Sequence, residues 1–307
     1  MTLRHYLADD DLTRAELHRV LALAADVKKR PGDYRMALAG QTLAMIFQKK
    51  STRTRVSFEV GMFQLGGHAL FLGGSDIQIG RGETIPDTAR VIGRYCDLIM
   101  ARVYGHADVA GLAEHAPVPV INGLSDALHP CQILADLQTI QERFGRLDGI
   151  RLAYIGDGNN MAHSLMIGGA LAGLHVRIGA PEGYQPQASY VERAAAIGKT
   201  TGGGVLVTSD PFEAARDADV IYTDVWASMG QEAEHAERVK AFAGFQVDAR
   251  LMGVASKDAV FMHCLPAHRG EEVSAEVADG PQSIIFDEAE NRLHAQKALM
   301  LFLKGAA

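Results

Sequence analysis

Short apolar segments alternate with longer amphipathic segments along the whole 307-residue chain. Apolar runs of this length, many of them rich in β-branched residues, predict β-strands. They lie at 42–47, 68–72, 98–101 and 118–121 in the first half, and at 151–155, 174–179, 205–207, 220–223 and 260–262 in the second half. Strands that alternate with helices in this way predict an α/β fold, in which helices cover both faces of parallel sheets.

The length of the chain predicts two domains, because a single hydrophobic core rarely grows to this size. The best boundary is the segment Gly145–Gly149, which lies between two series of strands and helices. We therefore predict two doubly wound parallel-sheet domains, residues 1–145 and 146–288, followed by a terminal helix within residues 289–307. In such folds ligands gather at the carboxyl ends of the strands.

Composition narrows the range of partners. Hydrophobic residues make up 48% and charged residues 22% of the chain, which is typical of a globular protein. The formal net charge of -7 and the lack of a basic face disfavour nucleic acid as a ligand. Cys96, Cys131 and Cys264 are too few for a disulfide framework, and we find neither an N-terminal signal region nor a run of membrane-spanning length. These features predict a cytoplasmic protein without membrane or nucleic-acid partners.

The most specific chemical signal follows the strand at 42–47. Two apolar stripes recur at helical spacing after residue 55 and predict a helix buried on much of its surface: Val56, Val60 and Phe63, and Phe58, Met62 and Leu65. Ser51 and Thr52 therefore begin a helix, where backbone N–H groups lack partners and the helix dipole is positive. Together with Arg53 and Arg55 they predict an anion cradle suited to a phosphate.

Two other interpretations of this junction are weaker. Ser51 could only cap the helix while the arginines lie on a solvated face, but cations in a first turn oppose the dipole. A P-loop is disfavoured because no glycine-rich loop precedes Lys50 and Ser51.

Further polar candidates lie at predicted strand ends and helix starts. Arg102 ends the strand at 98–101, His129 and Gln132 lie at the start of a helix, and Asp224 follows the strand at 220–223. Each of these types is also common as a plain cap or surface residue. The segment Gly156–Met161 superficially resembles a dinucleotide fingerprint, but it lacks the third glycine and no acidic residue ends the next strand. His263, Cys264 and His268 could suggest zinc, but a fourth ligand at a recognisable spacing is absent, so we predict no metal.

Four segments together resemble the aspartate and ornithine carbamoyltransferases over nearly the whole chain, and the ornithine members most closely. Ser51-Thr52-Arg53-Thr54-Arg55 resembles the family's carbamoyl-phosphate signature, and the segment from His129 to Asp136 matches its second motif. Asp224-Val225-Trp226-Ala227-Ser228-Met229-Gly230 matches the ornithine-specific loop, and His263-Cys264-Leu265-Pro266 matches the fourth motif. A carboxylate at Asp224 also suits a free α-amino group.

The resemblance implies transfer of a carbamoyl group from carbamoyl phosphate to the side-chain amine of L-ornithine, as part of arginine metabolism, without a cofactor or a metal. It implies carbamoyl-phosphate contacts from Ser51, Thr52, Arg53, Thr54, Gln78, Arg102, His129, Gln132, Cys264, Leu265 and Arg292. It implies ornithine contacts from Asn160, Asp224, Ser228 and Met229, catalytic roles for Arg102 and His129, and proton acceptance by Cys264. It further implies that the terminal helix packs back on the first domain, and that the chain forms a homotrimer or a multiple of trimers, in which Gln78 reaches a neighbouring active site.

Alternatives remain open at this point. The acceptor could be another amine, such as putrescine or an acylated ornithine, which should change the loop from Asp224 to Gly230. A non-catalytic regulatory relative should have lost some of Arg53, Arg102, His129 or Cys264, and all four are present. Gly82 lies where aspartate-specific relatives use a lysine, which weakens an aspartate acceptor.

Overall fold

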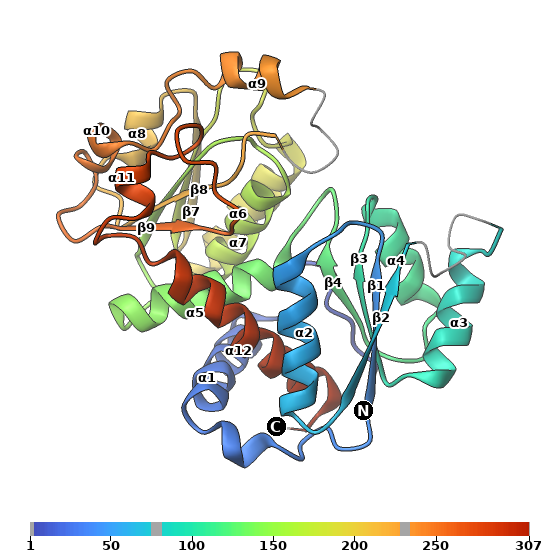
Figure 1. Cartoon of the computed structure of the whole chain (residues 1–307). Coiled ribbons are helices and arrows are strands. Elements are labelled where there is room, and N and C mark those ends of the chain that lie inside the picture. The colour runs from blue at the N-terminus through green and yellow to red at the C-terminus, as the bar shows by residue number, and fades with distance from the viewer. Residues whose placement is uncertain (1–2, 75–81, 228–233, 307) are drawn as a thin grey trace. The chain divides into compact units, whose positions relative to one another are not determined.

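The chain forms two compact units in a computed structural model that describes residues 3–74, 82–227 and 234–306 (Figure 1). One unit comprises Met1–Gln138 with Glu290–Ala307, and the other comprises Thr139–Ala289. The chain passes between the units within helix α5 (Pro130–Phe144) and again within α12 (Ile285–Lys304). The terminal segment therefore belongs to the first unit, as expected. The domain boundaries inferred from the sequence stay predictions.

The first unit contains a four-stranded parallel sheet in the order β2-β1-β3-β4, formed by His68–Gly73, Thr42–Phe47, Leu98–Arg102 and Val120–Leu124. Helices α3 (Ile85–Tyr95) and α4 (His106–His115) pack on one face, against a core that includes Ile46 and Ile99. Helix α2 (Thr52–Gln64) lies on the other face beside α12, and α1 (Arg14–Lys29) completes that layer (Figure 1). Short 3-10 helices lie at Asp9–Asp11 and Pro31–Tyr34.

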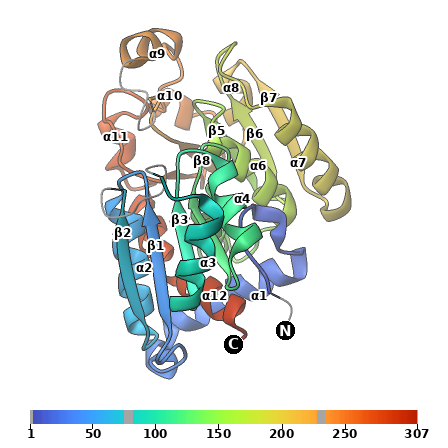
Figure 2. The same ribbon diagram turned by 90° about the vertical axis from the view of Figure 1, so that its right-hand side faces the viewer.

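The second unit contains a five-stranded parallel sheet in the order β7-β6-β5-β8-β9, formed by Gly204–Thr208, His175–Gly179, Arg151–Ile155, Val220–Thr223 and Val260–His263. Helices α6 (Asn160–Ala172) and α7 (Ala188–Thr201) lie side by side (Figure 2). An aromatic cluster around Phe242 and Phe261 lies on the other face, with α8 (Pro211–Ala215). The remaining helices are α9 (His235–Ala241), α10 (Ala249–Met252) and α11 (Ala275–Ala278).

Local sequence explains most of the element boundaries. Thr13 caps α1 in a reciprocal capping box with Glu16, and Thr84 caps α3, whose second residue is a proline. Gly173 ends α6 in the left-handed conformation at φ +84°, which glycine adopts without a steric penalty. The predicted α/β class with two parallel sheets is confirmed.

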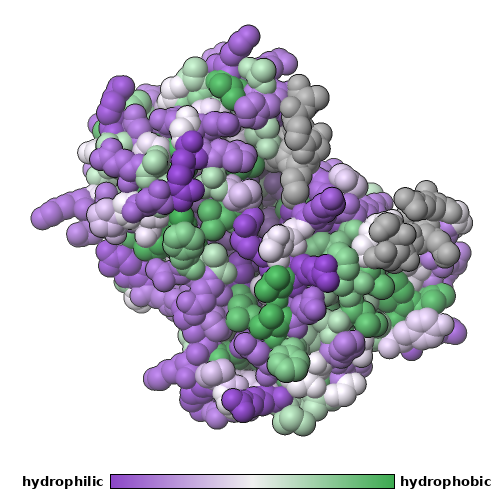
Figure 3. Space-filling model, viewed as in Figure 1, coloured by the Kyte–Doolittle hydropathy of each residue, from purple (hydrophilic) through white to green (hydrophobic). Residues whose placement is uncertain are grey.

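The expectation that α2 is buried on much of its surface is wrong. Phe58, Met62 and Leu65 are buried, whereas Val56, Val60 and Phe63 are 51%, 37% and 79% exposed. The sheet and α12 cover one side of α2, so only one of its two stripes is buried by the part of the chain that the structure describes. The other stripe forms an exposed apolar surface on α2. Figure 3 shows that hydrophobic residues reach the surface on the face of the molecule seen in Figure 1.

Three smaller expectations also differ from the structure. Helix α12 begins at Ile285 rather than near 289, because Ile285 packs into the core and Asp287 and Glu288 suit the positive end of a helix. Strand β4 begins at Val120 rather than 118, and helix α4 was not anticipated.

Among the described residues, none of the helices combines the length and apolarity that a membrane span requires.

Candidate active site

The first group of candidate residues gathers at the carboxyl ends of β1 and β3. Phe47 and Arg102 pair in register as the last residues of these two strands, and the Gln48 amide N–H donates to the Arg102 carbonyl at 2.9 Å. Ser51 follows as the N-cap of α2 and accepts a hydrogen bond from the Thr54 amide N–H at 3.3 Å. The parallel register therefore brings the signature segment beside Arg102, as the sequence predicted.

Arg292 of α12 joins two separate motifs of the first unit. The residue is 3% exposed, and its guanidinium donates to Gln132 Oε1 at 2.6 Å and to Thr54 Oγ1 at 3.2 Å. Gln296 Oε1 accepts from the same guanidinium, and Gln132 donates onward to Asp136. A buried cation is thus held in place by polar oxygens on α2, α5 and its own helix.

His129 lies within a strongly cationic part of this unit. It is buried immediately before α5, and burial lowers its pKa well below 6.5. The nearby charges of Arg292, Arg102 and Arg53 act in the same direction. The His129 imidazole is therefore neutral at pH 7, so the ring can donate a hydrogen bond without adding a further charge.

Arg55 does not belong to the anion cradle, contrary to our expectation. Its guanidinium lies 3.8 Å from the centre of the Phe71 ring and pairs with Glu59 at 3.4 Å. These contacts direct Arg55 toward β2 and along the flank of α2, because residues two apart on a helix point to different sides. Of the two arginines of the signature, Arg53 is the one whose charge reaches His129.

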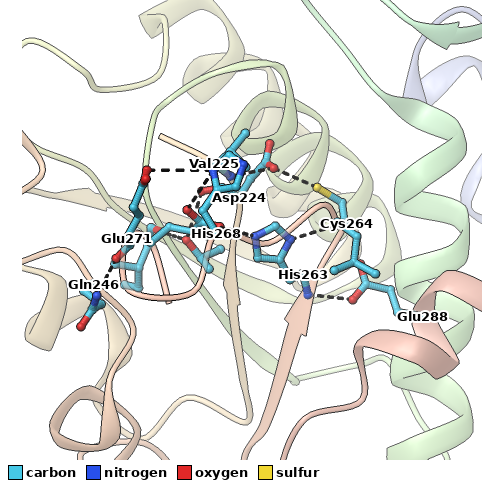
Figure 4. Close-up of polar contacts among 12 residues, drawn as sticks. Asp224, Val225, Gln246, His263, Cys264, His268, Glu271 and Glu288 are labelled. Atoms are coloured by element: carbon cyan, nitrogen blue, oxygen red, sulfur yellow. Dashed lines mark hydrogen bonds and ion pairs between the residues drawn. The ribbon is translucent and has the colours of Figure 1, made fainter. Parts of the chain in front are cut away.

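The second group of candidate residues gathers at the carboxyl ends of neighbouring strands in the other unit. Thr223 and His263 pair in register at the ends of β8 and β9, so Asp224 and Cys264 are the next residues on adjacent strands. The Cys264 thiol donates to Asp224 Oδ1 at 3.1 Å, and the Val225 amide N–H donates to the same oxygen at 2.8 Å (Figure 4). Asn160 is the first residue of α6, after the neighbouring strand β5.

A buried network fixes the backbone that carries Cys264. His263 Nδ1 accepts from the Leu265 amide N–H at 2.8 Å, so the proton of the neutral ring is on Nε2 and is donated to Glu272 Oε1 at 3.2 Å. The His263 amide N–H donates to Glu288 Oε2 at 2.8 Å (Figure 4). Leu265 has φ +60°, which is costly for a residue with a side chain. The network holds it in this conformation.

Arg238 connects the chain segments that carry Asp224 and Asn160. Its Nη1 donates to Asp157 Oδ2 at 2.8 Å and to the Trp226 carbonyl at 2.9 Å, while its Nε donates to Glu234 at 3.0 Å. Burial raises the pKa of Asp157, although the Arg238 charge acts in the opposite direction. Sequence reasoning missed Arg238, Asp157, Glu272 and Glu288, since a single acidic or basic residue carries no local pattern that reveals a distant partner.

Three expected site residues, Gln78, Ser228 and Met229, lie outside the described residues. The others fall into the two groups above: Ser51, Thr52, Arg53, Thr54, Arg102, His129, Gln132 and Arg292 in the first unit, and Asn160, Asp224, Cys264 and Leu265 in the second. The donor atoms of Asp224, His263 and Cys264 lie within 4.8 Å of one another, but all three side chains already engage in the hydrogen bonds described.

Two family models match the chain. The aspartate/ornithine carbamoyltransferase carbamoyl-P binding domain matches residues 4–142, and the Asp/Orn binding domain of the same family matches residues 148–303. The chain belongs to the aspartate/ornithine carbamoyltransferase family. Members of this carbamoyltransferase family with closely similar sequences include an ornithine carbamoyltransferase of Acidothermus cellulolyticus, 58% identical over 99% of this chain and 98% of that protein. The ornithine carbamoyltransferase of Thermococcus kodakarensis is 56% identical over 98% of this chain and 96% of that protein.

Solved structures of carbamoyltransferases have the same fold. The ornithine carbamoyltransferase of Pyrococcus furiosus superposes with a TM-score of 0.95 at 55% identity, covering 98% of this chain and 97% of that one. The anabolic ornithine carbamoyltransferase of Campylobacter jejuni superposes with a TM-score of 0.94 at 42% identity, covering 99% of this chain and 100% of that one. The two groups of site residues thus lie on a fold already known from ornithine carbamoyltransferases.

Proposed function

We propose that this chain is a carbamoyltransferase that moves the carbamoyl group of carbamoyl phosphate to the side-chain amine of L-ornithine, giving L-citrulline and phosphate. The observation that carries the proposal is the contact between Cys264 and Asp224 at adjacent strand ends, within two motifs that match the ornithine enzymes. The names of the relatives, at 55% to 58% identity, support the same activity.

Carbamoyl phosphate binds through the first unit in this proposal. Ser51, Thr52, Arg53 and Thr54 hold the phosphate at the N-terminus of α2, where N–H groups and a guanidinium offset the charge of the departing anion. Arg102 and the neutral His129 polarise the carbamoyl carbonyl. Gln132 and Arg292 bind the carbamoyl nitrogen, and the mutual hydrogen bond of their side chains supports a joint role. The backbone of Cys264 and Leu265 remains a predicted further contact.

Ornithine binds through the second unit. Asp224 attracts the α-ammonium group, and Asn160, Ser228 and Met229 orient the rest of the substrate. The attacking amine resembles that of lysine, with a solution pKa of about 10.4, so on the order of one molecule in a thousand is neutral at pH 7. Cys264 relays a proton as the amine attacks, because its thiol already donates a hydrogen bond to the Asp224 carboxylate at 3.1 Å and can pass its proton on.

The reaction then proceeds in two steps that need no further reactant. The amine nitrogen forms a bond to the carbamoyl carbon, and the oxyanion that develops is stabilised by Arg102, His129 and Thr54. The bond from carbon to the phosphate oxygen breaks, and phosphate leaves with the bonding electron pair. The nitrogen loses its surplus proton to the sulfur of Cys264, while the proton that the thiol carried passes along the existing hydrogen bond to the Asp224 carboxylate.

A homotrimer, or a multiple of trimers, completes the proposal, with Gln78 reaching the site of a neighbouring subunit. The exposed stripe Val56, Val60 and Phe63 supports a subunit interface, because large apolar surfaces of this kind are usually covered. We further propose a cytoplasmic setting in arginine biosynthesis. The three cysteines are all free, which suits a reducing compartment.

Product formation tests the activity directly. Carbamoyl phosphate is supplied with ornithine, putrescine, N-acetylornithine and aspartate in parallel, and we expect citrulline from ornithine alone. Turnover of another acceptor would contradict the role of Asp224 but keep the phosphate cradle. Carbamoyl phosphate binding without any turnover would favour a regulatory protein instead.

Light scattering tests the assembly separately. We expect a trimer or a multiple of trimers for the wild type, and dissociation when Phe63→Asp places a charge in the exposed stripe. Phe286→Asp is the matched control, because Phe286 is also an exposed phenylalanine, at 71%, but belongs to another helix. A monomeric wild type, or an unchanged mass for Phe63→Asp, contradicts the proposed interface.

A further inference from the structure

Four side chains that commonly bind metals meet on the second unit, outside the site described above. His235 begins α9, and His268, Glu271 and Glu272 lie in the loop between β9 and α11. The proposed reaction uses none of these four side chains to contact a substrate. We call them the His-Glu cluster.

The donor atoms of the cluster lie close together. His235 Nε2 is 3.0 Å from Glu271 Oε2, and His268 Nδ1 is 3.9 Å from that same oxygen. His268 Nδ1 is 3.8 Å from Glu272 Oε2, and one donor atom of each of His268, Glu271 and Glu272 lies within 4.8 Å of the others. Two tetrahedral ligands of one zinc ion, each roughly 2.0–2.2 Å from it, lie about 3.4 Å apart, which is within about half an ångström of the distances between these side chains.

Glu272 provides an independent indication of a ligand. Its side chain is fully buried, and its Oε1 accepts from His263 Nε2–H and from the His268 amide N–H. Its Oε2 is buried as well, yet it has no hydrogen-bond partner among the described residues, and it faces His268 Nδ1. A buried carboxylate oxygen without a donor is costly, and a cation is the partner that removes this cost.

The backbone beneath the cluster is held in place. The Val247 amide N–H donates to the Glu272 carbonyl at 2.8 Å, and Gln246 Nε2 donates to the Glu271 carbonyl at 2.7 Å. In Figure 4, His268 and Glu271 lie on the side of the His263 ring away from Cys264. Glu272 is thus fixed in position, whereas the side chains of His235, His268 and Glu271 are 48%, 50% and 34% exposed and have room to turn.

We propose that His235, His268, Glu271 and Glu272 form a binding site for a divalent transition metal, with Zn²⁺ the ion that fits best. Imidazole nitrogens with carboxylate oxygens suit zinc and its neighbours, whereas Ca²⁺ and Mg²⁺ prefer oxygen ligands alone. The site shares no ligand with the group of Asp224, His263 and Cys264, although Glu272 also accepts a hydrogen bond from His263 through its other oxygen. The proposal does not depend on the proposed function.

Calorimetric titration with ZnCl₂ tests the site in the full-length chain. The titration uses the Cys264→Ser variant, which lacks the one thiol of the active-site group. Zinc that a wild-type chain would bind through this thiol is then not mistaken for zinc bound at the His-Glu cluster. We expect one zinc per chain in this background, and a loss of affinity of about 100-fold or more when His268→Gln or Glu271→Gln is added, since even outer-shell partners of a metal cost roughly 10–100-fold. His175→Gln is the matched control, because His175 is an exposed histidine of β6 in the same unit.

Two further readouts separate coordination from a folding defect. Zinc should raise the melting temperature of the Cys264→Ser chain, and this increase should disappear with His268→Gln while the melting temperature without metal stays unchanged. The visible absorption spectrum of the Co²⁺-loaded chain should show the bands of a site with nitrogen and oxygen ligands. It should lack a thiolate charge-transfer band, both in Cys264→Ser and in the wild type. Absence of zinc binding in Cys264→Ser, equal weakening by His175→Gln, or binding unaffected by His268→Gln and Glu271→Gln overturns the proposal.

Discussion

Cys264 Sγ lies 3.1 Å from Asp224 Oδ1, because β8 and β9 end in register and place these two residues side by side. Since the chain positions are 40 residues apart, the pair exists only in the folded sheet. A thiol next to a carboxylate at the end of a parallel sheet is well placed to accept a proton and pass it on.

Replacing Cys264 separates proton transfer from binding. We expect Cys264→Ser to lower kcat by roughly 100-fold or more, the usual contribution of a positioned acid or base, with little change in carbamoyl phosphate affinity. Steady-state kinetics and calorimetry measure the two effects. A kcat close to that of the wild type would contradict the proposed proton acceptor.

Asp224→Asn should mainly weaken the binding of ornithine. The substitution removes the negative charge but keeps the size and one acceptor oxygen, so the ornithine KM should rise by roughly 30-fold or more, as expected for a broken buried charge pair. The KM for carbamoyl phosphate is measured in the same assay as the control. Equal changes in both constants would indicate a general disturbance of the fold instead.

Arg53→Ala should abolish measurable binding of carbamoyl phosphate, because this guanidinium lies at the helix N-terminus where the phosphate is proposed to bind. Arg55→Ala is the matched control from the same signature, since Arg55 stacks on Phe71 and pairs with Glu59. Calorimetry on the two variants compares the roles of the two arginines. If both lose binding, or neither does, the assignment of the cradle to Arg53 is wrong.

Arg238→Lys tests whether the buried guanidinium positions the ornithine-binding segments. Lysine keeps the charge but cannot bond Asp157, the Trp226 carbonyl and Glu234 together, so we expect the ornithine KM to rise by about 10-fold. The KM for carbamoyl phosphate should change less than about 2-fold. Arg151→Lys is the control, because Arg151 pairs with Asp219 at the opposite end of β5; if it shifts the ornithine KM equally, Arg238 has no special role.

The lowered pKa of His129 predicts how the free energy of unfolding depends on pH. Its pKa in the folded protein lies well below 6.5, mainly through burial, so as the pH falls below about 6.5 the unfolded chain binds a proton that the folded chain does not. His129 therefore lowers the free energy of unfolding as the pH decreases, and His129→Gln should lose less stability between pH 7 and 5 than the wild type. The ring resonances of His129 should stay unchanged over this range, whereas titration near pH 6.5 would contradict a neutral buried ring.

Local sequence was sufficient to locate most of the secondary structure and the chemistry of its termini. Strands β1, β5 and β8 follow from short apolar runs, and the caps at Thr13 and Thr84 follow from residue type, because these signals arise between neighbours in the chain. The motifs at 51–55, 129–136, 224–230 and 263–266 could be recognised for the same reason, since each lies within a single segment.

Contacts between distant segments required the tertiary structure. Arg292 bonds Thr54, 238 positions away in the sequence, and Arg238 bonds Asp157, 81 positions away. In neither pair does the sequence around one residue indicate its partner. The burial of α2 was misjudged because its two apolar stripes are alike in sequence, and only the position of the sheet and α12 determines which one is covered. Periodicity therefore located the elements, whereas packing determined which side chains are buried, paired or left at the surface.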